Sequence, residues 1–126
     1  MAIARLTLIT LDCNDPQVLA TFWAGLLEGQ IIRSDDHMAL VQTPGGAIAA
    51  VAVPDYHAPM WPGGTTPKHM HLDLAVSDLE TAEAVAVRLG ARIADFQPGG
   101  NRWRVLRDPA GHPFCLTLNI PTGWTC

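Results

Sequence analysis

Two histidines and one aspartate alternate along a single short stretch of the chain. His69, His71 and Asp73 stand two residues apart, and residues two apart on a β-strand lie on the same face of a sheet. Cys115 and Thr117 alternate in the same way farther along. Imidazole, carboxylate and thiolate groups bind metal ions, transfer protons or act as nucleophiles. These five residues are therefore the first candidates for a functional site.

The other face of the strand that carries the histidines must pack against a helix. Leu72, Leu74 and Val76 share one face of a strand predicted over residues 69–76. The helix predicted over residues 78–89 has an apolar stripe that needs such a face. The two histidines and the aspartate therefore belong to the opposite, helix-free face.

Two other predicted strands present their side chains in the same alternation. In the first half, the strand predicted from Ala2 to Asp12 puts Leu8 and Thr10 on the helix-free face. In the last predicted strand, Cys115 and Thr117 take that face. A face that mixes apolar and polar side chains is typical of a small-ligand pocket. The alternative is an open antiparallel face that is wet or is buried in a dimer contact.

Several of these side chains have two interpretations. His71 can activate Cys115 as a thiolate nucleophile if the two are close, or the cysteine is a buried and inert thiol. Trp103 can stack on a flat ligand, or it packs under the second helix. Trp61 can fold over the pocket as part of a lid, or it packs on the sheet from a plain crossover loop.

The chain contains two copies of one order of elements. Asp15 before Pro16 predicts one helix start, and Ser77 with Glu80 predicts a second through a capping box. The helix starts at residues 15 and 78 are 78 − 15 = 63 positions apart. Each half then has the order strand, helix, three strands. We therefore expect an α+β fold in which two βαβββ repeats form a cupped mixed sheet with the helices on its outer face.

These elements predict one domain over residues 1–126. Repeat one covers about 2–53, a proline-rich linker covers 54–67, and repeat two covers about 68–120. The other predicted strands cover residues 30–33, 37–43, 47–53, 91–95, 102–106 and 113–119.

The composition excludes several classes of function. The net charge is −4 and the eight Lys and Arg residues are scattered, which argues against nucleic-acid binding. No apolar run approaches the roughly 20 residues of a membrane span, and the start lacks the pattern of a signal peptide. Cys13, Cys115 and Cys126 are an odd, irregularly spaced set that we interpret as reduced thiols. We therefore expect a cytoplasmic protein that binds neither nucleic acid nor a membrane.

Three segments of the chain resemble the vicinal oxygen chelate superfamily, which contains the glyoxalases, bleomycin-resistance proteins and dioxygenases. The segments are Leu8–Pro16, His71–Leu79 and Arg107–Leu116, and the resemblance is greatest to its glyoxalase-like branch. It covers nearly the whole chain except residues 54–67 and the tail after Ile120. The resemblance implies the βαβββ fold, a small-molecule ligand and a homodimer.

The metal enzymes of this superfamily hold a divalent ion with one side chain from the first and one from the last strand of each half. In this chain the matching positions are Leu8, Val51 or Ala52, His71 and Cys115. Only the histidine keeps a familiar ligand type. A histidine with a cysteine lacks the oxygen ligands that magnesium and manganese prefer. We therefore expect no metal cofactor.

The resemblance and the residues together lead to three hypotheses. The first is a metal-free protein that binds a small organic molecule, for sequestration or for divergent catalysis. The second is a lyase, isomerase or dioxygenase that uses His71 and a metal, with His69 sharing the ion and Cys115 or Asp73 as a third ligand. The third is a dimeric interaction module without a ligand.

Overall fold

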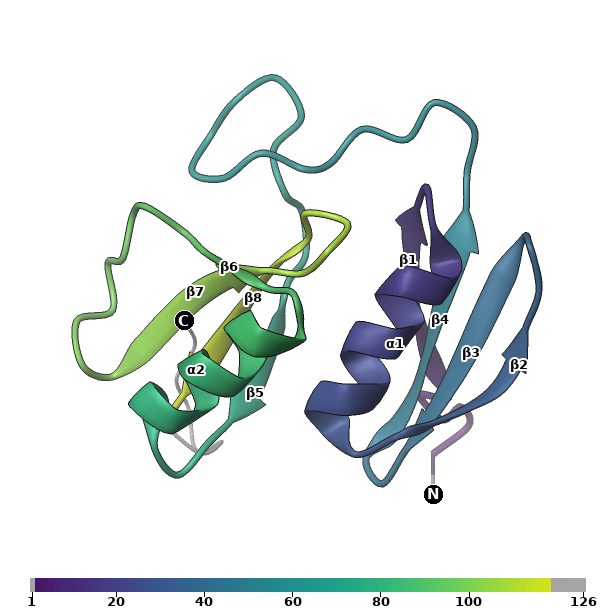
Figure 1. Cartoon of the computed structure of the whole chain (residues 1–126), viewed down its shortest axis with the longest axis horizontal. Coiled ribbons are helices and arrows are strands. Elements are labelled where there is room, and N and C mark those ends of the chain that lie inside the picture. The colour runs from purple at the N-terminus through teal and green to yellow at the C-terminus, as the bar shows by residue number, and fades with distance from the viewer. Residues whose placement is uncertain (1, 119–126) are drawn as a thin grey trace. The chain divides into compact units, whose positions relative to one another are not determined.

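The computed structural model describes residues 2–118 of the chain (Figure 1). It divides the chain into two compact units, the first ending at Tyr56 and the second beginning at His57. Each unit has the order strand, helix, three strands, which confirms the predicted α+β fold of two βαβββ repeats. The first unit contains β1 (Leu8–Cys13), α1 (Pro16–Leu27), β2 (Gln30–Ser34), β3 (Met38–Thr43) and β4 (Gly46–Ala52). The second contains β5 (Leu72–Ala75), α2 (Leu79–Leu89), β6 (Arg92–Ile93), β7 (Trp103–Arg107) and β8 (Pro113–Thr117).

The two units share one sheet topology. Their strand orders are β1-β4-β3-β2 and β5-β8-β7-β6. In both, the first strand of the unit pairs in parallel with the last, and the other pairings are antiparallel. The strands form two four-stranded sheets. The single cupped sheet that the sequence predicted is therefore not closed.

Three strands are shorter than predicted: β1, β5, and β6, which covers Arg92–Ile93 where the prediction was 91–95. β1 begins at Leu8 because its pairing with β4 begins at Leu8↔Ala47. β5 begins at Leu72, which pairs with Phe114. Pro113 precedes that partner, and a proline has no N–H to extend the ladder. His69 and His71 consequently lie in the segment that leads into β5, and the predicted Asn119 end of the last strand lies outside the described residues.

The first unit buries the strand face that the sequence predicted. Along β1, exposure alternates so that Ile9, Leu11 and Cys13 are the more buried residues. The helix above them starts as predicted, with the Asp15 side chain accepting a hydrogen bond from the backbone N–H of Val18 at 3.2 Å. The core beneath α1 includes Leu19, Phe22 and Trp23.

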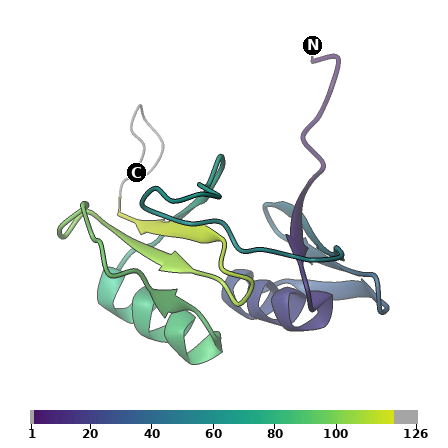
Figure 2. The ribbon, with the colours of Figure 1, turned by 90° about the horizontal axis from the view of Figure 1, so that it is seen from above.

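An ion pair identifies the face of the second sheet that α2 covers. Arg104 Nε lies 2.7 Å from Oε2 of Glu83, which belongs to α2. Arg104 pairs across the sheet with Leu116, and Leu116 pairs with Leu74. Residues directly opposite each other share a face, so all three lie under α2. Figure 2 shows α2 on one side of this sheet and the segment that precedes β5 on the other.

The cap of α2 differs from the predicted one. Asp78 is the N-cap residue, and its carboxylate accepts hydrogen bonds from the backbone N–H of Glu80 at 3.1 Å and the hydroxyl of Thr81 at 2.8 Å. The predicted capping box between Ser77 and Glu80 is therefore wrong. A carboxylate at this place also interacts favourably with the helix dipole, an advantage that a serine lacks.

No helix among residues 2–118 is long and apolar enough to cross a membrane.

Replacing the cap should destabilise the chain in a pH-dependent way. The hydrogen bond from Thr81 is the main cause that lowers the pKa of Asp78 below its usual value of 3.8. A lowered folded-state pKa contributes stability above the unfolded pKa, and this contribution is lost as the pH falls through the folded value. We expect Asp78→Ala to lower the Tm at pH 7 and the difference from wild type to shrink below about pH 4. Thermal melts between pH 3 and pH 7 measure this.

Ser77→Ala is the matched control and should leave the Tm unchanged at every pH. A loss in Ser77→Ala equal to that in Asp78→Ala would contradict the assigned cap.

Candidate functional site

The helix-free face of the second sheet consists of three rows of paired residues. Asp73, Cys115 and Val105 form the first row. Ala75, Thr117 and Trp103 form the second, and Pro113, Arg107 and Arg92 form the third. The prediction that Asp73, Cys115 and Thr117 share this face is confirmed.

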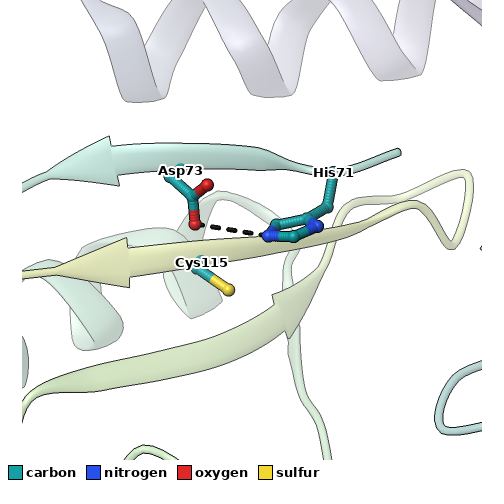
Figure 3. A group of neighbouring side chains, drawn as sticks. All are labelled: His71, Asp73 and Cys115. Atoms are coloured by element: carbon teal, nitrogen blue, oxygen red, sulfur yellow. Dashed lines mark ion pairs between the residues drawn. The ribbon is translucent and has the colours of Figure 1, made fainter. Parts of the chain in front are cut away.

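The structure brings three of the candidate side chains together (Figure 3). His71, Asp73 and Cys115 each offer one potential ligand atom, and these atoms lie within 4.8 Å of one another. His71 Nε2 lies 3.3 Å from Asp73 Oδ1, and both side chains are less than one-third exposed. His69, by contrast, is exposed and lies outside this group.

A lysine that the sequence argument did not include contacts the imidazole. Lys68 Nζ lies 3.5 Å from His71 Nδ1. An ammonium group can only donate, so Nδ1 acts as the acceptor and the ring proton is on Nε2, which faces Asp73. A metal ion shared with Asp73 and Cys115 would bind Nε2, which would move the ring proton to Nδ1, where it would face the ammonium group. The contact therefore disfavours metal binding at His71.

Cys115 is not a free thiol. The structure has it disulfide-bonded, whereas Cys13 is buried and is not part of a disulfide. The prediction of reduced thiols is therefore wrong for Cys115 and correct for Cys13, and Cys126 lies outside the described residues. A disulfide sulfur is neither a nucleophilic thiolate nor a thiolate ligand. The cysteines accordingly no longer support the expected cytoplasmic location.

Two tryptophans pack beside the cysteine on the helix-free face. Ala94, Val105 and Cys115 form a buried cluster, with Trp61 and Trp103 packed against it. The placement of Trp103 under the second helix is therefore excluded. Its ring lies so close to Gly99 that a Cβ there would meet ring atoms at 2.5 Å. Trp61, in the predicted linker, covers part of this face.

The first unit has the same register but different chemistry. Asp73 pairs with Cys115 in the second sheet, and Thr10 pairs with Ala49 in the first. The position that matches Cys115 is therefore Ala49, two or three residues before the predicted match at Val51 or Ala52. Leu8 and Thr10 lie on β1, both exposed within their unit. Their part in a pocket remains a prediction.

The sequence argument missed two residues of the face, Arg92 and Arg107, and Lys68 at its edge. The signal for Arg107 was available, because the Asp108–Gly111 turn joins β7 to β8. In that turn the Gly111 N–H donates to Asp108 O at 2.8 Å. Counting back from Cys115 through the turn would have placed Arg107 on the helix-free face. No local pattern indicates the contact of Lys68 with the imidazole.

A separate cavity of about 260 Å³ lies beside α2. It includes the Glu83–Arg104 ion pair, and the side chains of the helix-free face do not line it. Its lining residues are Leu79, Glu80, Glu83, Gly100, Asn101 and Arg104. The two charges that pair there already neutralise each other, so we do not place the ligand in this cavity.

The family of the chain follows from comparison with known sequences. The sequence model of the glyoxalase-like domain matches residues 8–117. The chain belongs to the glyoxalase-like family. Membership in the vicinal oxygen chelate superfamily, which the three segments suggested, is thereby confirmed. No curated protein matches this glyoxalase-like chain in sequence.

Solved structures share the fold at low sequence identity. A glyoxalase-related enzyme from Fulvimarina pelagi is 19% identical with a TM-score of 0.67, covering 93% of this chain and 89% of its own. Fosfomycin resistance protein FosX from Mesorhizobium loti is 14% identical with a TM-score of 0.69, covering 94% of both chains. A mutant FosX from Listeria monocytogenes, complexed with Mn(II) and 1S,2S-dihydroxypropylphosphonic acid, is 17% identical with a TM-score of 0.70, covering 94% of this chain and 93% of its own. These identities support the fold alone.

The oxidation state of Cys115 can be measured directly. We expect alkylation of the denatured, unreduced protein to label Cys13 and not Cys115, and prior reduction to make both reactive. Peptide mass spectrometry quantifies each label, and Cys13 serves as the internal control. Full labelling of Cys115 without reductant would contradict the disulfide.

Proposed function

We propose that this glyoxalase-like chain binds a small organic molecule against the helix-free face of its second sheet, without the divalent metal of the superfamily's metal enzymes. The observation that carries the proposal is the contact of Lys68 Nζ with His71 Nδ1 at 3.5 Å. His71 is the only residue of this chain that keeps a familiar ligand type of the superfamily pattern. The ammonium group of Lys68 is its neighbour. A side chain therefore supplies positive charge at this site, where a metal ion supplies it in the superfamily's metal enzymes.

The residue types of the first unit support the same proposal. The position that matches His71 by the 63-residue offset is Leu8, and the register match of Cys115 is Ala49. Neither alkyl side chain can bind a metal. With Cys115 held in a disulfide, the superfamily's four-ligand arrangement reduces to one histidine. Magnesium or manganese would gain little from such a donor set.

The remaining side chains of the face suit an organic ligand. Trp61 and Trp103 offer aromatic surface, and Asp73 offers a carboxylate on the same face, whereas Thr117 is buried there. A wall that is mostly apolar with a few polar groups is characteristic of small-molecule sites. The bound molecule is either sequestered or chemically altered there, and both outcomes use the same binding face.

A metal-dependent lyase, isomerase or dioxygenase is the second candidate function. One observation favours it, which is the approach of His71, Asp73 and Cys115 to within 4.8 Å of one another. After reduction of Cys115, these residues would present nitrogen, oxygen and sulfur donors, a set that suits zinc. The neighbour from Listeria monocytogenes shows that this fold can carry Mn(II) in another chain.

We also propose that the chain forms a homodimer. β2 is an edge strand of the first sheet, and its Ile31 and Ile32 are 41% and 57% exposed. Edge strands with exposed apolar residues are commonly covered by self-association.

Metal analysis separates the two candidate functions. We expect the protein, purified under reducing conditions without chelators, to contain far less than one equivalent of any divalent metal. Elemental analysis by mass spectrometry measures this, with His37→Ala as a control for an exposed histidine. Near-stoichiometric metal that is lost in His71→Ala and kept in His37→Ala would overturn the metal-free proposal.

A thermal-shift screen with a broad library of small organic molecules tests ligand binding itself. A ligand that binds only the folded state raises the free energy of unfolding by RT ln(1 + [L]/Kd), about 2.7 kcal/mol at a hundredfold excess over Kd. We expect hits whose shifts fall in Asp73→Asn, which removes a carboxylate charge at nearly constant volume, and persist in Asp36→Asn, at an exposed aspartate of the first unit. A flat response across the library would favour the interaction module.

A further inference from the structure

Three cations belong to the helix-free face of the second sheet or to the segment beside it, and they lack acidic partners. Arg107 and Arg92 are paired on the face itself, and Lys68 contacts His71 at its edge. Within residues 2–118, the ion pairs involve other side chains: Arg33 with Asp35, His71 with Asp73, and Arg104 with Glu83. The face therefore carries uncompensated positive charge, although the whole chain has a net charge of −4.

The two arginines stand directly opposite each other. Arg92 of β6 pairs with Arg107 of β7 in an antiparallel register. Like charges at directly opposed positions destabilise a sheet. An anion bound between two such guanidinium groups would convert this repulsion into two attractive contacts.

Arg107 is anchored by one hydrogen bond and has a further N–H donor without a partner. Its Nη2 donates a hydrogen bond to the backbone carbonyl of Trp61 at 2.7 Å. Its Nε is buried and has no hydrogen-bond partner, and a buried donor without a partner is destabilising. The neighbouring Asp108 does not relieve this cost, because its Oδ1 accepts the backbone N–H groups of Ala110 and His112 at 3.0 and 2.9 Å. An anchored guanidinium with an unsatisfied donor is suited to a planar oxyanion.

Trp61 connects the two ends of this cationic surface. Its carbonyl accepts from Arg107, and Lys68 Nζ lies 5.9 Å from the centroid of its ring. Phe96 lies beside it, with ring centroids 5.5 Å apart. A ligand whose charged group reaches Arg107 therefore finds aromatic surface next to it.

We propose that the site takes an aromatic carboxylate, with the carboxylate bound by Arg107 and Arg92 and the ring packed beside Trp61. This inference rests on the proposed function and names the ligand class of that same face. Asp73 is the only carboxylate in the three rows of the face, and it already contacts His71 at 3.3 Å. Charge complementarity therefore favours an anionic ligand over a cationic one.

Benzoate and its neutral isostere benzamide are the probes that test the proposal. Isothermal titration of the whole chain should show benzoate binding at least tenfold more tightly than benzamide. A hydrogen bond between charged groups is stronger than one between neutral groups, and tenfold in affinity corresponds to about 1.4 kcal/mol. We therefore expect Arg107→Gln to weaken benzoate binding at least tenfold, and Arg92→Gln to weaken it severalfold.

Arg88→Gln is the matched control, because Arg88 is an exposed cation on α2 and its loss changes the net charge equally. It should leave benzoate affinity unchanged. Arg92 is exposed as well, so Arg92→Gln keeps the test valid if Arg107→Gln fails to fold. Wild-type affinity in Arg92→Gln together with equal affinity for benzoate and benzamide would overturn the proposal.

The library screen distinguishes failure of this inference from failure of the proposed function. Neutral library hits together with absent benzoate binding would overturn the carboxylate proposal and leave small-molecule binding intact. No binding by any library member or by benzoate would overturn both.

Discussion

The register between β5 and β8 is the constraint on which the candidate site depends. Asp73 lies opposite Cys115, and Cys115 lies opposite Val105 on β7. Because side chains alternate across a strand, a slip of one residue in either pairing would put Cys115 under α2 and Leu116 on the helix-free face. The burial of Leu116 beneath α2 is what opposes such a slip. The apolar packing under α2 thus fixes the register that keeps the polar side chains on the helix-free face.

The two repeats keep one backbone arrangement and differ in side-chain chemistry. In the second unit the helix-free face has an imidazole, a carboxylate and a disulfide sulfur, whereas the matching positions of the first unit are Leu8, Thr10 and Ala49. Replacing a side chain on a helix-free face leaves the strand pairing and the helix contacts untouched. The fold can therefore persist while the ligand set of the superfamily is lost from one half.

Charge on the second sheet follows a consistent pattern. Lys68 contacts Nδ1 of His71, the ring nitrogen other than the one near Asp73, and Arg107 directs its guanidinium toward the backbone of Trp61. Both cations contact or flank the same tryptophan, so the loop before β5 is tied to the face that it covers. Side-chain cations act through charge and hydrogen bonds and, unlike a divalent ion, do not coordinate a substrate oxygen. They suit recognition of an anion better than activation of a substrate oxygen.

The sequence by itself determined the elements and their faces. A two-residue alternation predicted which side chains of β1, β5 and β8 are helix-free, and Asp15 before Pro16 predicted the start of α1, because these are properties of local backbone geometry. Only the tertiary structure decided which side chains contact one another. The contact of Lys68 with His71, the bond of Arg107 to Trp61 and the disulfide state of Cys115 join residues through loops and neighbouring strands. Local periodicity carries no information about such contacts, because they depend on how the loops return to the sheet.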